Sequence, residues 1–279
     1  MTAVGEVRVS SAWLRLREPA DAAARSTVLA RTAAVSVGRA AVTVVHDLGC
    51  GSGSMGRWLA PQLPGAQHWV LHDRDPDLLR VAATHGPGSG ADGAAVSVEG
   101  RQGDLTRLGP ADLAGASLVT ASALLDMLTA DEAERFVRSC VAAHCPVLVT
   151  LSVTGRVRLS PADPLDAMFG AAFNDHQRRT DGGRTLLGPL AVHAAVLLFR
   201  ALGSRVEVRA SPWRLGADHG PLLAEWLSGW VGAACEQRPE LGAVGAAYLA
   251  RRRAELAQGR LAVTVHHLDL LALPAGGGK

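Results

Sequence analysis

Seven short apolar runs recur along the chain and alternate with stretches of helical periodicity. The runs are nearly continuous, as expected of strands that are covered on both faces of a parallel sheet. They predict strands over residues 42–48, 67–72, 95–102, 117–121, 146–153, 204–211 and 261–270. Because strands that alternate with helices build crossover units, the pattern predicts an α/β fold with a mostly parallel, doubly wound sheet.

Three stretches do not fit a minimal alternating fold. Residues 1–40 are expected to form one or two helices that cap the sheet, and residues 41–279 to form the α/β domain. Within that domain, residues 154–189 interpose extra chain after the fifth strand, and residues 217–259 are largely helical. Such additions either build a lid or simply pack on the fold. We expect the two insertions to form a substrate lid.

The composition excludes several classes of protein. The 279 residues are 48% hydrophobic and 19% charged, which allows a sizeable core and excludes a disordered chain. The 28 basic and 26 acidic residues leave a formal net charge of +2, without the strong positive field of proteins that bind nucleic acid. The four cysteines fit neither a disulfide framework nor a zinc site. We therefore expect no nucleic-acid partner and no metal.

The sequence predicts neither a signal peptide nor a membrane span. Glu6 and Arg8 stand where a signal peptide would need an apolar run. The longest apolar stretch, residues 186–203, is interrupted by a proline, a histidine and an arginine, so it cannot span a bilayer. The expected location is the cytoplasm, without a membrane partner.

The most informative segment reads V-T-V-V-H-D-L-G-C-G-S-G-S-M-G-R-W-L. An apolar strand ends at Asp47, and a glycine loop and then a helix follow. Gly49 and Gly51 permit a tight turn and the close approach of a ligand, and Gly53 permits close packing of the helix. The loop opens on the N-terminus of that helix, which favours a ligand with an anionic or polar tail.

Two classes of cofactor compete for this loop. Its glycines also satisfy the dinucleotide fingerprint G-x-G-x-x-G, with Asp73 about 20 residues further on. Asp47 separates the two readings, because its carboxylate would repel a pyrophosphate and attract the ammonium of an amino acid. Asp73 can accept hydrogen bonds from ribose hydroxyls, and Asp104 one from an adenine amine. An amino group, a ribose and an adenine together describe S-adenosylmethionine.

At these motifs the chain resembles the class I S-adenosylmethionine-dependent methyltransferases. D-L-G-C-G-S-G, D-R-D-P-D-L-L, Q-G-D-L and S-L-V-T-A-S-A-L-L-D-M-L are similar to four successive motifs of that family, over roughly residues 40–155. The resemblance implies the Rossmann-like methyltransferase fold, a seven-stranded sheet whose last strand is antiparallel. It also implies the residues that would bind the cofactor: Asp47, Gly49, Cys50, Gly51 and Gly53 around the methionine part, Asp73 at the ribose, and Arg74, Asp104 and Leu105 around the adenine.

One departure from a simple match concerns the ribose ligand. Asp75 is a second acid two positions after Asp73, and either carboxylate could bind the ribose. The V-x-x-D-x-D-P pattern favours Asp73, because this residue comes directly off the strand.

Several acceptor classes lack their motifs. Amino-methylating enzymes of nucleic acids carry N/D-P-P-Y/F after strand four, where this chain reads S-A-L-L-D-M. Cytosine C5 chemistry needs a nucleophilic cysteine beside the site, whereas Cys140 and Cys145 are expected to be core thiols. A catechol-type metal site needs several converging carboxylates, and Asp126 alone does not establish one.

The segment 163–183 offers the best candidates for chemistry. Phe169, Ala172 and His176 recur at helical spacing, so His176 is expected on an apolar face, where it is either a general base or a packing residue. Asp126, near the end of strand four, is the second catalytic candidate, with a purely local role before the next helix as its alternative. Three further residues are candidates for binding the substrate: Gln177, Arg178 and Trp13. A solvated face is the alternative for Arg178.

The predicted function is methyl transfer by in-line displacement to a small molecule, in specialised metabolism. The partly apolar insertions suit an enclosed pocket better than an open nucleic-acid surface. Methylation of RNA or protein is a second enzymatic reading and would require a basic or extended groove. A cofactor-binding partner subunit is the non-enzymatic reading, and the presence of all three acids and all loop glycines argues against it.

Overall fold

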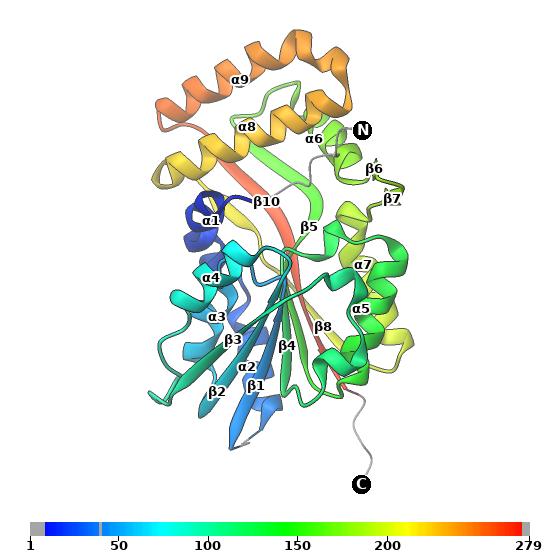
Figure 1. The fold of residues 1–279 in the computed structure, drawn as a ribbon. Helices are drawn as coiled ribbons and strands as arrows, with labels where there is room; N and C mark the ends of the chain where they lie inside the picture. The colour runs from blue at the N-terminus through cyan, green and yellow to red at the C-terminus, as the bar shows by residue number, and fades with distance from the viewer. Residues whose placement is uncertain (1–8, 39–40, 275–279) are drawn as a thin grey trace.

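A single twisted sheet forms the centre of the molecule (Figure 1). The computed structural model describes residues 9–38 and 41–274. Along the sheet the strand order is β3-β2-β1-β4-β5-β10-β8, with the short β9 paired to β10. Their bounds are β1 Val42–Leu48, β2 Ala66–Asp73, β3 Val96–Gln102, β4 Leu118–Ser122, β5 Val147–Ser160, β8 Arg205–Ala210, β9 Trp213–Leu215 and β10 Ala262–Leu273.

The strand directions confirm the predicted doubly wound fold. Strands β1 to β5 pair in parallel, and β10 runs antiparallel between β5 and β8. Seven of the eight strands correspond to the seven apolar runs of the sequence. The eighth, β9, is only three residues long and was not predicted, because W-R-L offers too short a pattern.

Strands β5 and β10 are longer than the sequence indicated. They pair as far as Ser160 and Ala262, so the chain that was expected as an insertion after residue 153 begins as a continuation of β5. Register shifts interrupt this pairing near Asp269, whose Oδ1 accepts a hydrogen bond from the Leu151 amide at 2.8 Å. Leu151 has a φ of +57° at this point. Such irregularities bend a strand and re-aim its side chains, and the two strands curve away from the sheet beyond them (Figure 1).

Helices cover both faces of the sheet. Helices α2 (Thr27–Val37), α3 (Ser54–Leu59) and α4 (Pro76–Thr84) bury their apolar sides on one face. Helices α5 (Ala130–Ala142) and α7 (Ala191–Ala201) cover the other face. Helix α1 (Ser11–Ala24) lies beside β9, near the carboxyl ends of the parallel strands.

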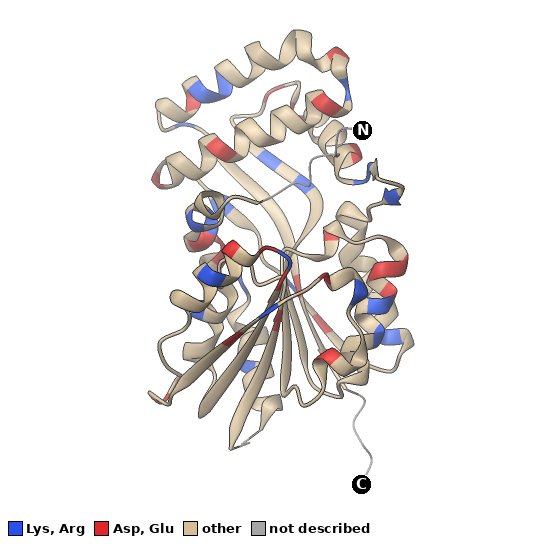
Figure 2. Ribbon diagram, in the orientation of Figure 1, with Lys and Arg blue, Asp and Glu red and all other residues tan. Residues whose placement is uncertain are grey.

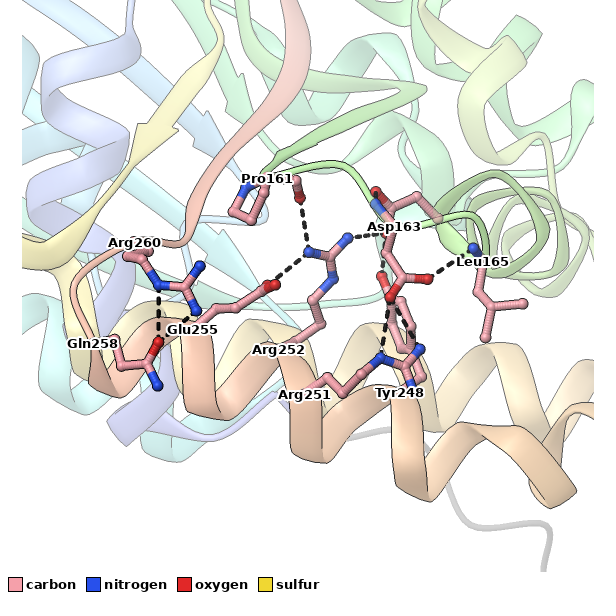
Figure 3. A network of polar contacts seen from close by, with 10 residues as sticks. Pro161, Asp163, Leu165, Tyr248, Arg251, Arg252, Glu255, Gln258 and Arg260 are labelled. Atoms are coloured by element: carbon pink, nitrogen blue, oxygen red, sulfur yellow. Dashed lines mark hydrogen bonds and ion pairs between the residues drawn. The ribbon is translucent and has the colours of Figure 1, made fainter.

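The curved ends of β5 and β10 carry a helical subdomain, formed by α6 (Asp166–Gln177), α8 (Gly220–Gln237) and α9 (Gly242–Ala257). Its core contains Phe169, stacked on Tyr248 at a centroid distance of 4.4 Å. The buried Arg252 of α9 joins this core to the end of β5 through Asp166 and the Pro161 carbonyl, the latter at 2.8 Å (Figure 3). A buried guanidinium needs such partners, because an unpaired one would be strongly destabilising.

None of the helices within the described residues combines the length and the apolar character needed to cross a lipid bilayer.

Candidate active site

A cavity of about 550 Å³ opens at the carboxyl edge of the parallel strands, beneath the helical subdomain. Open α/β sheets bind ligands at this edge. The volume lies in the range typical of small-molecule sites, about 300–1,000 Å³. The loops after β1, β2 and β3 line one end of it, called here the cofactor end. Residues from α1, the β5 and β10 extensions, β9, α6 and α8 line the other, called here the acceptor end.

The glycine loop after β1 is fixed to the neighbouring strand. The amides of Gly49 and Cys50 donate to the His72 carbonyl at 2.8 and 3.0 Å. Gly49 has a φ of +70°, and a Cβ there would lie 3.1 Å from Leu124 Cδ1. Any other residue would therefore be strained in its backbone and would crowd the cavity wall.

Asp47 supplies a buried carboxylate below this loop. Its Oδ1 accepts a hydrogen bond from the Thr120 hydroxyl at 2.8 Å, and its Oδ2 is buried without a hydrogen-bond partner. Burial raises the pKa of Asp47 to about 6, although the Thr120 hydrogen bond and the nearby Arg25 act in the opposite direction. A cationic ammonium group would fit this carboxylate, because it would supply the missing donor and a compensating charge.

Asp73 and Asp75 follow β2 and both line the cavity, but they make different contacts. Asp73 accepts hydrogen bonds from the amides of Gly51 and Asp75 at 2.8 and 3.0 Å, so its carboxylate is held against the glycine loop. Asp75 caps helix α4 by accepting from the amide of Asp77 at 2.9 Å. Asp75 therefore caps a helix, whereas Asp73 binds the amides of the two neighbouring loops.

The loop after β3 completes the cofactor end. Asp104 lies at the start of the 3₁₀ turn Leu105–Arg107, and its Oδ1 accepts from the amide and hydroxyl of Thr106 at 3.0 and 2.8 Å. Leu105 and Arg74 line the same part of the cavity. Gly53 does not line the cavity, although its neighbours Ser52 and Ser54 do, and its expected contact with the cofactor stays a prediction. Its α-carbon faces helix α4, and a Cβ there would lie 3.1 Å from the Cβ of Ala82.

Aromatic and branched apolar side chains form the walls of the acceptor end. Trp13 of α1 and Trp213 of β9 lie 6.5 Å apart, tilted by 60°. Trp226 of α8 is stacked on Trp230 behind it, with a centroid distance of 5.4 Å. Further apolar residues of this wall include Val153, Val157, Phe173 and Val265.

Three polar side chains interrupt these walls. Asp126, in the turn after β4, is half-buried, and its burial raises its pKa to about 6. His267 of β10 is only 4% exposed, and burial together with the charge of Arg17 lowers its pKa to about 3, so its ring is neutral. The Oε1 of Gln177 and the Nδ1 of His267 are both buried without a hydrogen-bond partner.

Arg17 of the acceptor end and Arg184 of the short strand β7 (Arg184–Thr185), which also lines the cavity, are already paired with carboxylates. Arg17 donates two hydrogen bonds to Asp21, at 2.9 and 3.2 Å, and its guanidinium lies over the Trp213 ring at 5.0 Å. Asp21 also accepts from the Trp213 Nε1 at 2.9 Å, so the three residues form one network. Arg184 pairs with Glu132 at 2.9 and 2.6 Å.

The structure brings Asp126, Gln177 and Trp13 together in the cavity, but not His176 or Arg178. The Nε2 of His176 lies 3.3 Å from Glu236 of α8. The Arg178 side chain is half-exposed and pairs with Asp175. The roles of both residues stay predictions.

Helix geometry explains why His176 does not line the cavity. The apolar stripe through Phe169 and Ala172 is fully buried in the core of the helical subdomain, and His176 continues it towards α8. Phe173 and Gln177, each one position further along, project from the adjacent face into the cavity.

Sequence reasoning also missed Trp213 and His267, which line the cavity. A histidine within an otherwise apolar strand, in V-T-V-H-H-L-D-L, was the only available signal for His267. No group of three or more His, Cys, Asp or Glu side chains within residues 9–38 and 41–274 is arranged to hold a metal ion.

Comparisons with known proteins found one family model and several solved structures. Residues 45–146 match a family model described as a methyltransferase domain. No curated protein matches the chain. The cyclopropane synthase MmaA2 from Mycobacterium tuberculosis is 14% identical, with a TM-score of 0.49 over 95% of this chain and 94% of that one. An S-adenosylmethionine-dependent methyltransferase from Geobacter sulfurreducens, solved with S-adenosyl-L-homocysteine, is 16% identical, with a TM-score of 0.47 over 96% of this chain and 100% of that one.

The matched residues contain the cofactor end of the cavity. The match spans β1 to the start of β5, including Asp47 at the end of β1, the glycine loop and the acids that follow β2 and β3. This part of the chain therefore matches a methyltransferase domain, and the cofactor end lies within it.

Proposed function

We propose that this enzyme transfers a methyl group to a small molecule held inside the cavity. The observation that carries the proposal is the acceptor end, where α1, α6, α8 and β9 place aromatic side chains around the space next to the cofactor end. A concave, mostly apolar pocket of this size with a few polar groups is typical of sites for small ligands. A role in specialised metabolism and a cytoplasmic location remain predictions from the sequence.

At the cofactor end, each acid is proposed to bind one part of the cofactor. The unpartnered Oδ2 of Asp47 suits the amino group, Asp73 suits the ribose hydroxyls and Asp104 suits the adenine amine. When bound, the cofactor supplies an electrophilic methyl group, whose bond to sulfur breaks as the acceptor atom bonds to carbon, leaving S-adenosylhomocysteine and a proton. Arg74 and Leu105 would border the adenine, and Gly49, Cys50 and Gly51 the methionine part.

Asp126 is proposed to take the proton that the acceptor loses. It lies in the turn after β4, which lines the cavity together with both the glycine loop and the acceptor end. Its raised pKa of about 6 leaves it ionised at neutral pH and more basic than an exposed aspartate. General bases with a pKa close to the working pH are the more effective ones. Trp13 and Gln177 are proposed to bind the acceptor.

Methylation of RNA or protein would need an open or basic surface beside the cavity. Arg17 and Arg184 in the cavity lining are paired with carboxylates instead, and acidic and basic residues are interspersed over the outer helices in the view of Figure 2. The charge distribution therefore favours a small acceptor.

Label transfer tests this proposal. The protein is incubated with methyl-labelled S-adenosylmethionine and a bacterial extract separated into small-molecule, RNA and protein fractions. We expect label in the small-molecule fraction, and none there with the Asp73→Ala variant. Label in the RNA or protein fraction alone would contradict the proposal and favour the corresponding macromolecular acceptor.

A further inference from the structure

We propose that the acceptor is an uncharged, ring-containing molecule whose nucleophile is a hydroxyl group, and not a carboxylate or a phosphate. This inference deepens the proposed small-molecule function and rests on it. Three features of the acceptor end support it. Aromatic side chains form its walls, its arginine is already paired with a carboxylate, and buried polar atoms of its lining lack hydrogen-bond partners.

The aromatic walls of the acceptor end suit a flat, apolar acceptor molecule. Trp13 and Trp213 present two tilted rings, and Trp226 is held in place by its stack on Trp230. Phe173 of α6 also lines this space. Aromatic side chains pack well against rings, in tilted or offset arrangements, and contribute more than area burial alone. A compact ring system therefore fits this space better than a polar chain does.

The charges at this end oppose an anion. Arg17 uses two of its nitrogens on Asp21, which is itself 4% exposed. An acceptor carboxylate or phosphate would have to compete with this carboxylate for Arg17. Asp126 adds a second negative charge at neutral pH, and Arg17 is also the cation that favours its ionised form. A buried anion without its own counter-charge is strongly disfavoured.

The unpartnered polar atoms call for a donor. Gln177 Oε1 and His267 Nδ1 are both buried and lack a hydrogen-bond partner, and both residues line the cavity. Gln177 Oε1 and the Asp126 carboxylate accept hydrogen bonds, whereas His267 Nδ1 accepts or donates according to the tautomer of its neutral ring. A hydroxyl group both donates and accepts and carries no formal charge, so it matches these groups. During transfer its oxygen would form the new bond to carbon and its proton would pass to the Asp126 carboxylate. Leaving buried acceptors unpaired is unfavourable, which makes the donor a source of selectivity.

Three naphthalenes of similar size test the inference by equilibrium binding. The probes are 2-naphthol, 2-naphthoate and 2-methylnaphthalene, each titrated calorimetrically into protein saturated with S-adenosylhomocysteine. We expect 2-naphthol to bind about 3–10-fold more tightly than 2-methylnaphthalene, because it supplies a hydrogen-bond donor. We expect 2-naphthoate to bind at least about 10-fold more weakly than 2-naphthol, because its charge has no counter-ion in the pocket.

Two variants assign the selectivity to residues. Gln177→Leu and His267→Phe should each weaken binding of 2-naphthol about 3–10-fold and leave 2-methylnaphthalene unchanged. Matched controls outside the cavity are Gln237→Leu at the end of α8 and His193→Phe on α7, both at exposed positions, and neither should change any probe. If the buried His267→Phe variant does not fold, the binding data of Gln177→Leu test the inference by themselves.

Three outcomes would overturn the inference: tighter binding of 2-naphthoate than of 2-naphthol, no binding of 2-naphthol, or unchanged binding of 2-naphthol by the folded variants. Failure of the proposed function is distinguishable, because it would appear as label in macromolecules or as a protein that does not bind S-adenosylhomocysteine. A protein that binds S-adenosylhomocysteine, labels small molecules and prefers 2-naphthoate would refute only the acceptor class.

Discussion

The two ends of the cavity are built in different ways. At the cofactor end, short loops after β1, β2 and β3 supply acids whose positions are set by backbone amides, as when Gly51 and Asp75 donate to Asp73. At the acceptor end, the side chains come from α1, β5, β9, α6, α8 and β10, which are distant in sequence. The first end is a local property of three strand–loop units, whereas the second depends on how a helical subdomain packs on the sheet.

This difference has a consequence for function. A cofactor site made of local units needs only the sheet to be formed, because parallel strands bring their carboxyl ends to one edge. The acceptor end needs the bend in β5 and β10 and the docking of α1 and α8. Substitutions at the cofactor end should therefore change cofactor affinity, and those at the acceptor end should change turnover or acceptor binding.

The largest expected effect is that of Asp126→Asn. This change keeps the size of the side chain and removes its ability to take a proton, so turnover should fall about 10²–10⁴-fold while the affinity for S-adenosylhomocysteine changes little. Turnover of the unmodified enzyme should rise with pH through about 6, as Asp126 loses its proton. Steady-state rates with the acceptor found by label transfer, measured from pH 5 to 8, check both. An unchanged rate in Asp126→Asn would assign the proton transfer elsewhere.

The next largest expected effect distinguishes the role of Asp73 in cofactor binding from the role of Asp75 in capping α4. Asp73→Ala should weaken binding of S-adenosylhomocysteine by about 1–3 kcal/mol, because it removes the partner of the ribose hydroxyls. Asp75→Ala should leave affinity almost unchanged and lower the free energy of unfolding by about 1 kcal/mol, since Asp75 caps α4. Calorimetry and denaturant unfolding of both variants distinguish the roles. The reverse pattern would make Asp75 the ribose ligand.

A pH-dependent effect on stability is expected from Asp47. Its pKa, raised from 3.8 to about 6, means that the folded protein binds this proton more tightly than the unfolded chain does. The stability that this gives is fully present below pH 3.8 and is lost as the pH rises through about 6. Asp47→Asn should therefore stabilise the ligand-free protein at pH 7.5 by up to about 3 kcal/mol, with little difference near pH 4.

Denaturant unfolding at the two pH values measures this difference between Asp47→Asn and the unmodified protein. The same variant should bind S-adenosylhomocysteine more weakly, because it lacks the charge that suits the amino group. A stability difference that is the same at both pH values would show that Asp47 is not a buried, ionised carboxylate.

The smallest expected effect is that of His176→Ala. Its imidazole faces Glu236, which is 75% exposed, so the pair contributes little to stability. Turnover should stay within about twofold of the unmodified enzyme, in contrast to Asp126→Asn. A loss of turnover of about 10²-fold in His176→Ala would instead indicate that His176 accepts the proton.

The contrast between the two ends also explains what the sequence could predict. The glycine loop, Asp73 and Asp104 were found because each follows an apolar strand directly, and the sheet fixes where such residues meet. Asp126 was found by the same rule after the fourth strand. At α6, however, an apolar stripe alone does not reveal which neighbour it packs on, and here it faces α8 and α9 instead of the cavity.

The remaining acceptor residues depend on long-range packing. Trp213 reaches the site because β9 pairs with β10, and His267 because register shifts in β10 leave its ring against the cavity. Arg17 is set by its contacts with Asp21 and Trp213, 192 positions apart. Periodicity within single elements carries no information about such pairings.

The central claim is that the loops after β1, β2 and β3 hold S-adenosylmethionine, and calorimetric titration with S-adenosylhomocysteine and with NADH tests it most directly. We predict micromolar-range binding of S-adenosylhomocysteine, because Asp47 offers a carboxylate to its amino group and Asp73 to its ribose. We predict no measurable heat with NADH, whose pyrophosphate Asp47 would repel. Heat with NADH and none with S-adenosylhomocysteine would contradict the account.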